Sequence, residues 1–446
     1  MHSDLRLGRC LAAVLLAAGL AVPVWGMTGP AASAASLTAG AEDVRPDSEG
    51  WVRRVRPVEP QARLTAADIA LPASVRLADR AASPRTVYLA RLLKGVERSP
   101  YVLYGHQNDL HHKANASAAS PSDTFIDVGD YSAVSGFDFQ ALEHGEFELT
   151  PAEQQQGLTL IEKMARICES GDQQGVLFTA SAHMPNFAVV AKRGRKDGAY
   201  DYTGYTTPVV EGDVVRRIMP GGDLNECYRG YLDMMADMGK RLAQKDIPLI
   251  VRLFHENDGS WFWWGAAHCT PEQYVALYRY TVEYLRDVKG VHNFLYAYSP
   301  GGPVRSRADF LERYPGDAYV DIIGFDTYQR DGQSDAEFQR LVGDSLDVLH
   351  DFAARHHDKI VALTETGLIE DGHALRQRGS AGKHWFTGMQ RLLGQHQVSY
   401  FMTWSNDDAR TFFEPFMVDD ERGHELINEF VDFYNMPGSI FAHQLP

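Results

Sequence analysis

Short apolar runs alternate along the chain with longer stretches of helical periodicity. Eight runs of strand length are each followed by a helix-like stretch, and they cover Tyr101–Tyr104, Tyr131–Phe139, Gly175–Ala180, Ile247–Val251, Phe294–Tyr298, Val320–Phe325, Ile360–Leu363 and Val398–Thr403. These runs are almost continuously apolar, which is typical of parallel strands that are buried on both faces. The pattern therefore predicts an α/β protein with a (β/α)8 barrel, whose active site would lie at the carboxyl ends of the strands.

Polar and aromatic residues follow most of these runs. The ones that stand at or just after a predicted strand end are His183, Glu256, Asp326, Tyr328, Glu365 and Trp404. A doubly wound open sheet is the alternative fold, but it would gather its ligand-binding groups at one switch point. The spread over several strands favours the barrel.

Several helices carry clear start signals or a period near 3.6. Thr150-Pro-Ala-Glu153 is a capping box with proline at the first helical position, and it predicts one helix that runs to about Ser170. A second box at Thr270–Gln273 opens another helix, and apolar residues recur helically from Leu224 to Leu242. We expect a polar insertion at 188–222 and a last helix near Glu421–Tyr434.

The first residues have the organisation of a targeting segment. Arg6 and Arg9 precede the apolar run Leu11–Val22, and small residues follow at Ala31–Ala35. This order is typical of a secretory signal peptide, which we assign to residues 1–34. The prediction is a secreted or periplasmic protein that is not bound to a membrane after the signal is removed. Residues 35–85 are predicted to form an irregular arm or linker, and the barrel occupies residues 86–446.

The charge limits the possible partners, and the cysteines limit the possible disulfides and metal sites. The 446 residues include 59 Asp and Glu against 43 Lys and Arg, a formal net charge of −16, which argues against a nucleic-acid partner. Outside the leader the cysteines are Cys168, Cys227 and Cys269, which allow at most one internal disulfide of unknown pairing. No Cys-x-x-Cys or His-Glu-x-x-His motif occurs, so we expect no metal and no cofactor.

The stretch from Arg252 to Gly265 carries the strongest chemical signal. A cation, an imidazole and a carboxyl end the predicted fourth strand, and three tryptophans follow within four residues. A carboxyl can protonate a leaving oxygen and an indole can stack on a sugar ring, so the stretch suggests carbohydrate chemistry. A structural aromatic cluster with a satisfied His–Glu pair is the alternative. Trp263 and Trp264 are expected to alternate between core and cleft.

A pair of glutamates supports an enzyme. If Glu256 ends the fourth strand and Glu365 the seventh, the two face each other across the barrel mouth, as glycoside hydrolysis requires of its two carboxyls. Arg252 and Tyr328 could keep Glu365 ionised, while apolar indoles could help keep Glu256 protonated. A non-catalytic carbohydrate-binding barrel has no need for both carboxyls.

These residues form a recognisable pattern. The sequence Arg252-Leu-Phe-His255-Glu256-x-x-Gly259-Ser-Trp261-Phe-Trp-Trp264-Gly265 resembles the acid/base signature of glycoside hydrolase family 26, the β-mannanase family. Further landmarks of that family match in order at Gly105–Gln107, His183–Phe187, Pro220–Gly222, Gly324–Tyr328 and Thr364–Gly367. The resemblance covers about Tyr88 to Val418 and implies that the predicted domain at 86–446 is catalytic. It would act, with retention of configuration, as an endo-β-1,4-mannanase on mannan, glucomannan or galactomannan. We expect a monomer.

The resemblance also implies roles for single residues. Glu256 would be the acid/base and Glu365 the nucleophile. The sugar would be bound by His183, His255, Trp261, Tyr328 and Trp404, with Arg252 and Asp326 in support. Two positions depart from the family pattern: Ser405 stands where many members have Arg, and Asp258 where Asn is common. The first departure leaves the endo or exo mode open, and with it β-1,3-xylan or mixed-linkage β-glucan as the substrate.

Overall fold

The computed structural model describes residues 45–115, 120–143, 147–370, 372 and 374–446. The predicted signal peptide lies outside the described residues, as do the first residues of the arm. The description below concerns the described residues of the unit Gly40–Pro446.

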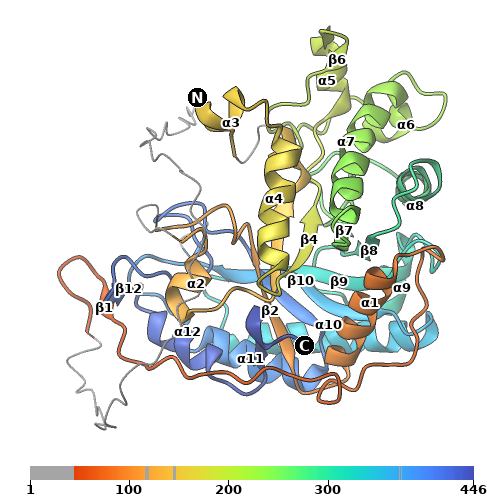
Figure 1. The fold of residues 1–446 in the computed structure, drawn as a ribbon. Coiled ribbons are helices and arrows are strands. Elements are labelled where there is room, and N and C mark those ends of the chain that lie inside the picture. Colours follow the sequence, from red (N-terminus) through yellow and green to blue (C-terminus); the bar gives the residue numbers. More distant parts are fainter. Residues whose placement is uncertain (1–44, 116–119, 144–146, 371, 373) are drawn as a thin grey trace. The chain divides into compact units, whose positions relative to one another are not determined.

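The centre of this unit is a closed barrel of parallel strands (Figure 1). In barrel order they are β2 (Val102–Gln107), β3 (Val134–Asp138), β4 (Leu177–Ser181), β7 (Leu249–Arg252), β8 (Phe294–Tyr298), β9 (Ile322–Arg330), β10 (Ile360–Ile369) and β11 (Tyr400–Thr403). The last strand, β11, pairs in parallel with β2 and closes the barrel. A short extra strand, β13 (Ser439–Ile440), also pairs with β2. The (β/α)8 barrel predicted from the apolar runs is confirmed.

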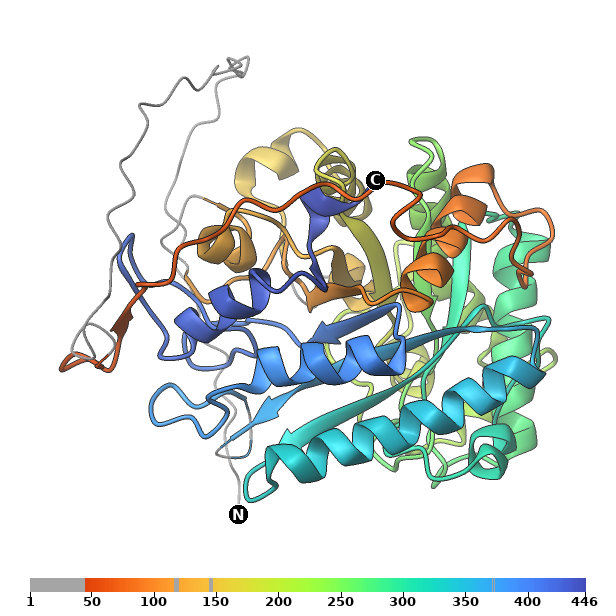
Figure 2. The same cartoon turned by 90° about the horizontal axis from the view of Figure 1, so that it is seen from below.

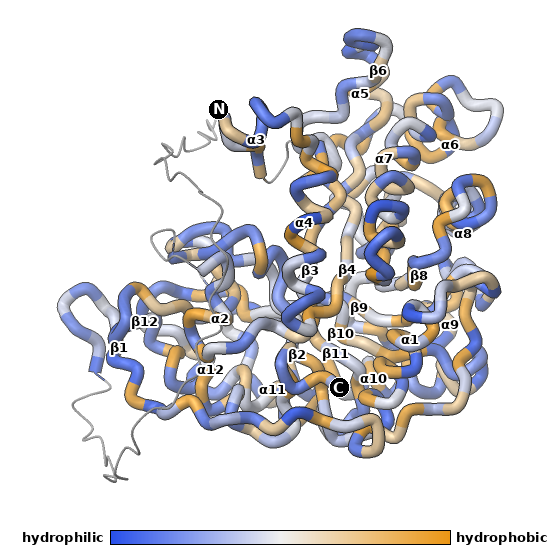
Figure 3. Tube along the Cα trace, viewed as in Figure 1, coloured by the Kyte–Doolittle hydropathy of each residue, from blue (hydrophilic) through white to orange (hydrophobic). Residues whose placement is uncertain are grey.

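Helices follow the strands and cover the outside of the barrel. They are α1 (Pro84–Glu97), α2 (Asp123–Val128), α3 (Pro151–Gln155), α4 (Leu160–Asp172), α5 (Phe187–Arg193), α6 (Val214–Ile218), α7 (Asn225–Ala243), α8 (Pro271–Glu283), α9 (Arg307–Glu312), α10 (Asp335–Arg355), α11 (Trp385–His396) and α12 (Ile427–Tyr434). Polar and apolar residues alternate along α4 and α7 (Figure 3), as expected of helices that bury one face. None of the described helices is long and apolar enough to span a membrane.

Two helix predictions need correction. The helix expected from Thr150 to about Ser170 is divided into α3 and α4. Gly157, between them, has φ +71°, a conformation that ends a helix. Thr159 then forms a second capping box with Glu162. The last helix begins at Ile427 instead of Glu421, because strand β12 (Arg422–Gly423) precedes it.

The insertion at 188–222 contains regular structure of its own. Besides most of α5 and all of α6, it forms a small hairpin of β5 (Arg195–Lys196) and β6 (Ala199–Tyr200). Asn186 caps α5 and also donates to the carbonyls of Val209 and Glu211. The insertion is thereby tied back to the end of β4.

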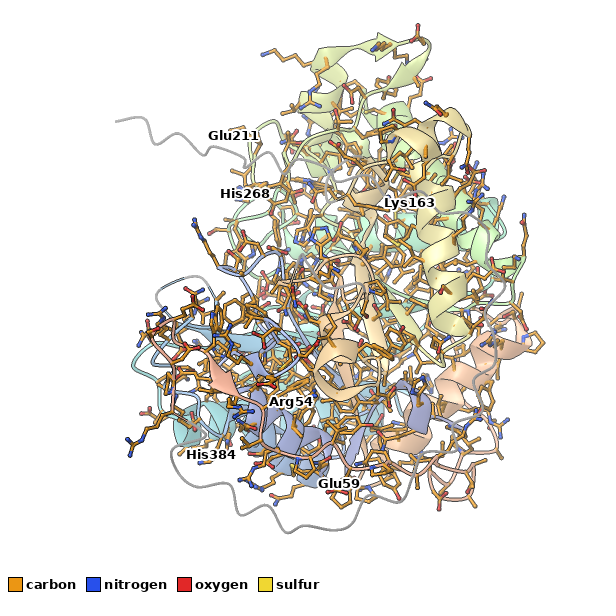
Figure 4. All side chains as sticks on the ribbon, turned by 60° about the vertical axis from the view of Figure 1, so that its left-hand side comes forward. Arg54, Glu59, Lys163, Glu211, His268 and His384 are labelled. Carbon is orange, nitrogen blue, oxygen red and sulfur yellow. The ribbon has the colours of Figure 1, made fainter. Side chains whose placement is uncertain are left out.

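The described part of the arm runs along the barrel toward the C-terminus (Figure 2). Its strand β1 (Val52–Arg53) pairs with β12, and Arg54, labelled in Figure 4, donates to the carbonyl of Asp127 at 2.6 Å. Farther along, the amide of Leu64 donates to the carbonyl of Gln444 at 2.8 Å. These backbone and side-chain hydrogen bonds hold the arm to the same unit as the barrel.

Candidate active site

The chain turns sharply where it leaves β7. Phe254 and Glu256 have φ values of +47° and +50°, a left-handed conformation that costs roughly 1–3 kcal/mol at residues other than glycine. The Tyr274 hydroxyl donates to the carbonyl of Phe254 at 3.0 Å, and the Glu256 amide donates to Ser299 at 2.8 Å. These contacts hold Glu256 just beyond the end of the strand.

Two of the three neighbouring tryptophans are structural. Trp263 and Trp264 are 1% and 0% exposed, and their indole N–H groups donate to the carbonyls of Met184 at 3.0 Å and His255 at 2.8 Å. The expected alternation of this pair between core and cleft is therefore wrong. A buried indole N–H needs a hydrogen-bond acceptor. Each ring finds one in a backbone carbonyl, and these two bonds anchor the loop.

Trp261 has the opposite environment. It is 48% exposed, and its indole N–H donates to Glu256 Oε2 at 2.6 Å. A Cβ atom at Gly259 would lie 2.4 Å from this indole, so only glycine leaves room for the ring. One side chain thus offers an exposed aromatic surface and also contacts the Glu256 carboxyl.

Glu365 lies inside strand β10, two residues beyond the strand end predicted from the sequence. A bulge at Thr364 shifts the register, so that Leu363 pairs with Phe325 but Glu365 pairs with Asp326. Bulges commonly redirect a side chain near an active site. Here the bulge sets the carboxyls of Glu365 and Asp326 beside each other.

A buried arginine joins the two carboxylates. Arg252, the last residue of β7, donates through one guanidinium nitrogen to Asp326. Through the other it donates to Glu365 Oε2 at 2.5 Å. The Tyr328 hydroxyl donates to Glu365 Oε1 at 2.5 Å. Each carboxyl oxygen of Glu365 therefore accepts one hydrogen bond, from Arg252 and from Tyr328, the two residues that the sequence analysis expected to act on Glu365.

The carboxyls of Glu256, Asp326 and Glu365 converge at the mouth of the barrel. One oxygen atom from each lies within 4.8 Å of the others. Three such oxygens could hold a cation, but Arg252 already donates to two of these carboxyls. A metal ion would therefore have to displace the guanidinium.

The surroundings give the ionisable groups different protonation states. Burial and the neighbouring Glu365 carboxylate raise the pKa of Glu256 to about 7. Burial and the charge of Arg252 lower the pKa of His255 well below its usual value. At neutral pH Glu256 is therefore protonated in part of the molecules while His255 is neutral, a pair of states suited to general-acid chemistry.

His183 is held by a carboxylate that the sequence did not single out. Its Nδ1 lies 2.7 Å from Asp138 Oδ2, and its amide also donates to Asp138. Burial favours the neutral imidazole, but Asp138 reverses this effect and raises the pKa of His183. The ring lies 4.6 Å from that of His255 and 5.9 Å from that of Trp404.

A cavity of about 290 Å³ opens beside this group, with His183, Trp404, Asn108, Tyr205, Ser405 and Asp407 in its wall. Tyr205, from the insertion, is 56% exposed, and its ring centroid lies 6.1 Å from that of His183. A polar cavity with aromatic walls suits a sugar ring.

Comparison with known proteins identifies the family. The family described as "Glycosyl hydrolase family 26" matches residues 79–410. The chain belongs to glycosyl hydrolase family 26. A mannan endo-1,4-β-mannosidase from Bifidobacterium adolescentis is 34% identical over 344 residues, 75% of this chain and 32% of that protein. One from Bacillus subtilis strain 168 is 29% identical over 32% of this chain and 40% of that protein. The chain thus spans well under two thirds of the length of each of these two relatives.

Solved structures of the same family have this fold. The catalytic domain of the Bacillus sp. JAMB-750 endo-β-1,4-mannanase aligns with a TM-score of 0.70 and 31% identity, over 83% of this chain and 95% of that one. A modular endo-β-1,4-mannanase from Cellulomonas fimi gives 0.70 and 33%, over 84% and 79%. The family 26 resemblance stated from the motifs is therefore confirmed.

Most of the family 26 motif residues come together at the carboxyl ends of the strands, namely His183, Arg252, His255, Glu256, Trp261, Asp326, Tyr328 and Glu365. Pro220–Gly222 lies apart from the strands, between α6 and α7. Sequence reasoning missed Asp138, Tyr205 and the bond from Trp261 to Glu256. Asp138 does end a predicted strand, which is a usable signal. Tyr205 lies in an insertion without periodicity, so its neighbours in space could not be foreseen.

Proposed function

We propose that this family 26 protein is a retaining endo-β-1,4-mannanase, with Glu256 as acid/base and Glu365 as nucleophile. The observation that carries the proposal is that oxygens of the two carboxyls lie within 4.8 Å of each other. Carboxyls about 5–5.5 Å apart are typical of retaining glycosidases, whereas inverting enzymes need about 6.5–9.5 Å to admit water.

In the first step Glu365 attacks the anomeric carbon, and the bond from that carbon to the leaving oxygen breaks. Arg252 and Tyr328 support this role because they hold Glu365 as an oriented anion. Glu256 gives its proton to the leaving oxygen. Its raised pKa, about 7, supports this role because an acid must be protonated at the working pH.

In the second step a water molecule attacks the glycosyl-enzyme and Glu256, now ionised, takes the proton. Glu365 leaves as a carboxylate, and the two inversions together retain the anomeric configuration. Formation of the covalent ester removes the negative charge on Glu365, and hydrolysis of the ester restores it. The pKa of Glu256 should therefore fall in the intermediate, which suits its change from acid to base.

Aromatic and imidazole groups would bind the sugar. We assign substrate contacts to His183, His255, Trp261, Tyr328 and Trp404. Exposure of Trp261 and the cavity beside His183 and Trp404 support these assignments. Arg252 and Asp326 would act as positioning residues, since each contacts the substrate only through its neighbours.

The preference for mannan rests on relatives whose names state that activity. Ser405, at a position where many members have Arg, keeps β-1,3-xylan and mixed-linkage β-glucan as second candidates. Reducing-sugar release should be measured on mannan, glucomannan, galactomannan, β-1,3-xylan and lichenan. Release from the mannans supports the proposal, whereas release only from the other two corrects the substrate.

A binding-only barrel is tested separately. Glu365→Gln should abolish turnover and leave the binding of mannan oligosaccharides intact, as measured by calorimetry. Equal turnover by the variant and the natural protein would contradict catalysis by this carboxyl.

We also propose that residues 1–34 are removed during export and that the mature protein is a secreted monomer. In this proposal 35–85 form the arm and 86–446 the catalytic domain. The backbone hydrogen bonds of residues 52–64 with β12 and with Gln444 support that division. Mass spectrometry of the exported protein gives its N-terminus, and light scattering gives its oligomeric state.

A further inference from the structure

A second hollow lies beside the loop that carries Glu256, with Asn257 and Asp258 in its wall. It has a volume of about 370 Å³ and is lined by residues that follow β7 and β8, among them Asp258, Gly301, Arg305 and Arg313. Its volume is within the range of about 300–1,000 Å³ that is usual for small-molecule sites. It shares none of its lining residues with the cavity beside His183.

Asp258 connects the two loops that form this hollow. Its Oδ1 accepts a hydrogen bond of 2.6 Å from the amide of Gly301. A Cβ atom at Gly301 would lie 2.9 Å from the same oxygen, so the close approach of the loops needs glycine there. The other oxygen, Oδ2, accepts no side-chain or backbone hydrogen bond from any other described residue.

Arg305 supplies a donor to the same hollow. It is exposed, and no ion pair or hydrogen bond holds its guanidinium within the described part of the chain. The hollow therefore offers a carboxylate oxygen that accepts and a guanidinium that donates. Sugar hydroxyls both donate and accept, and can satisfy the two groups together.

The position of Glu256 indicates which end of the substrate would enter. A general acid must touch the leaving oxygen, so the leaving sugar lies against the loop that carries the acid. Asp258 follows Glu256 by two residues. The cavity beside His183 is formed instead by residues that include those at the ends of β4, β11 and β2. We therefore assign this cavity to the sugar that becomes bonded to Glu365.

We propose that Asp258 and Arg305 bind the hydroxyls of sugars on the leaving-group side of the cleaved bond. The polysaccharide then continues past Glu256 on both sides, and the enzyme cleaves internal linkages. This inference rests on the proposed glycosidase function. It assigns a specificity role to Asp258, a position at which this chain departs from the family pattern.

The test compares two substrates with the full chain. Mannopentaose places sugars in the hollow, whereas 4-nitrophenyl β-mannobioside leaves as a nitrophenol and places none there. Arg305→Ala should lower the ratio of kcat/KM for mannopentaose to that for the aryl substrate about 10-fold or more, the usual effect of a lost charged hydrogen bond. Asp258→Ala should lower the same ratio.

Two variants separate binding from structure. Asp258→Asn keeps an oxygen for the Gly301 amide but removes the charge, so it should lower the ratio less than Asp258→Ala. Arg307→Ala is the matched control, because Arg307 is also exposed but lies 3.8 Å from Asp351 on the outer helices. It should leave both rates unchanged.

An unchanged ratio of the two kcat/KM values in Arg305→Ala overturns the proposal. If both kcat/KM values fall by the same factor, the ratio is also unchanged, and the substitution acts through the position of the Glu256 loop. Failure of the proposed mannanase function is visible separately, since the unmodified protein would then cleave no mannan oligosaccharide. If another β-glycan is the substrate, the same ratio is measured with its oligosaccharide and aryl glycoside.

Discussion

The indole N–H of Trp261 donates a 2.6 Å hydrogen bond to Glu256 Oε2. This bond stabilises the ionised carboxyl and so lowers its pKa, against burial and the Glu365 carboxylate, which raise the pKa to about 7. An exposed ring suited to stacking on a sugar therefore also adjusts the protonation of the proposed acid. Binding and proton transfer are coupled through one side chain.

Trp261→Phe should move the pH dependence of activity. Phenylalanine keeps an aromatic face but loses the N–H, so the pKa of Glu256 should rise. The acid works only when protonated, and the alkaline limb of kcat/KM should therefore move to higher pH. Trp263→Phe, a buried control, should lower the melting temperature without moving this limb. A limb that stays or moves to lower pH in Trp261→Phe would contradict the assignment.

The fold was largely predictable because burial on both strand faces leaves a strong mark in the sequence. The ends of the strands were less predictable than the fold. The bulge at Thr364 places Glu365 within β10. The sequence of apolar and polar residues around Thr364 does not indicate a shift in register. Trp263 and Trp264 were misjudged for a similar reason, since strict alternation holds in strands but this segment is a turn.

Contacts across the barrel were the hardest part to foresee. Arg252 and Glu365 are 113 residues apart, and their pairing could be suggested only after a barrel had been assumed. Asp138 and His183 meet because β3 and β4 are neighbours in register. Such pairs follow from topology, which the apolar runs predict, together with side-chain directions, which they do not.

Tyr328→Phe should impair catalysis without unfolding the protein. It removes the hydroxyl that donates to Glu365 Oε1, while Arg252 still holds Oε2. A hydrogen bond to a charged group contributes about 1.5–3 kcal/mol, so kcat should fall roughly 10- to 150-fold. Tyr278→Phe, which loses a distant bond to the carbonyl of Ala297, should keep its activity per folded molecule. Equal activity of Tyr328→Phe and the natural protein would remove the role given to Tyr328.

Chelation of metal ions should leave activity unchanged. Glu256, Asp326 and Glu365 converge closely, but Arg252 supplies their positive charge. Activity should be measured after dialysis against EDTA and again after addition of single divalent cations. Loss in EDTA with recovery by one cation would mean that a metal ion takes the place of the guanidinium.

Asn428→Ala should loosen the arm. The Asn428 side chain accepts from the amides of Val55 and Arg56 and donates to the carbonyl of Arg53, and each bond contributes about 0.5–1.5 kcal/mol. Limited proteolysis should then cut near residues 50–60 faster, with kcat unchanged. Asp432→Ala removes only an exposed ion pair with Arg56 and should have little effect. Equal proteolysis of both variants would mean that Asn428 does not hold the arm.

Glu256 and Glu365 should fail in different ways, because they act in different steps. Glu365→Ala cannot form the glycosyl-enzyme, so every substrate should lose activity alike. Glu256→Ala withholds a proton whose transfer contributes typically about 10²–10⁴-fold. An aryl glycoside with a good leaving group needs little protonation, so its first step should survive in Glu256→Ala and produce a burst of released phenol.

Azide then distinguishes the two carboxyls by stereochemistry. In Glu256→Ala the intermediate on Glu365 accumulates because no base activates water, and azide attacks without needing deprotonation. That attack is the second inversion, so turnover should return with a β-glycosyl azide as the product, identified by NMR. In Glu365→Ala azide can attack only the substrate itself, a single inversion that gives the α-product. An α-glycosyl azide from Glu256→Ala would reverse the two roles, because it would mean that the alanine had replaced the nucleophile.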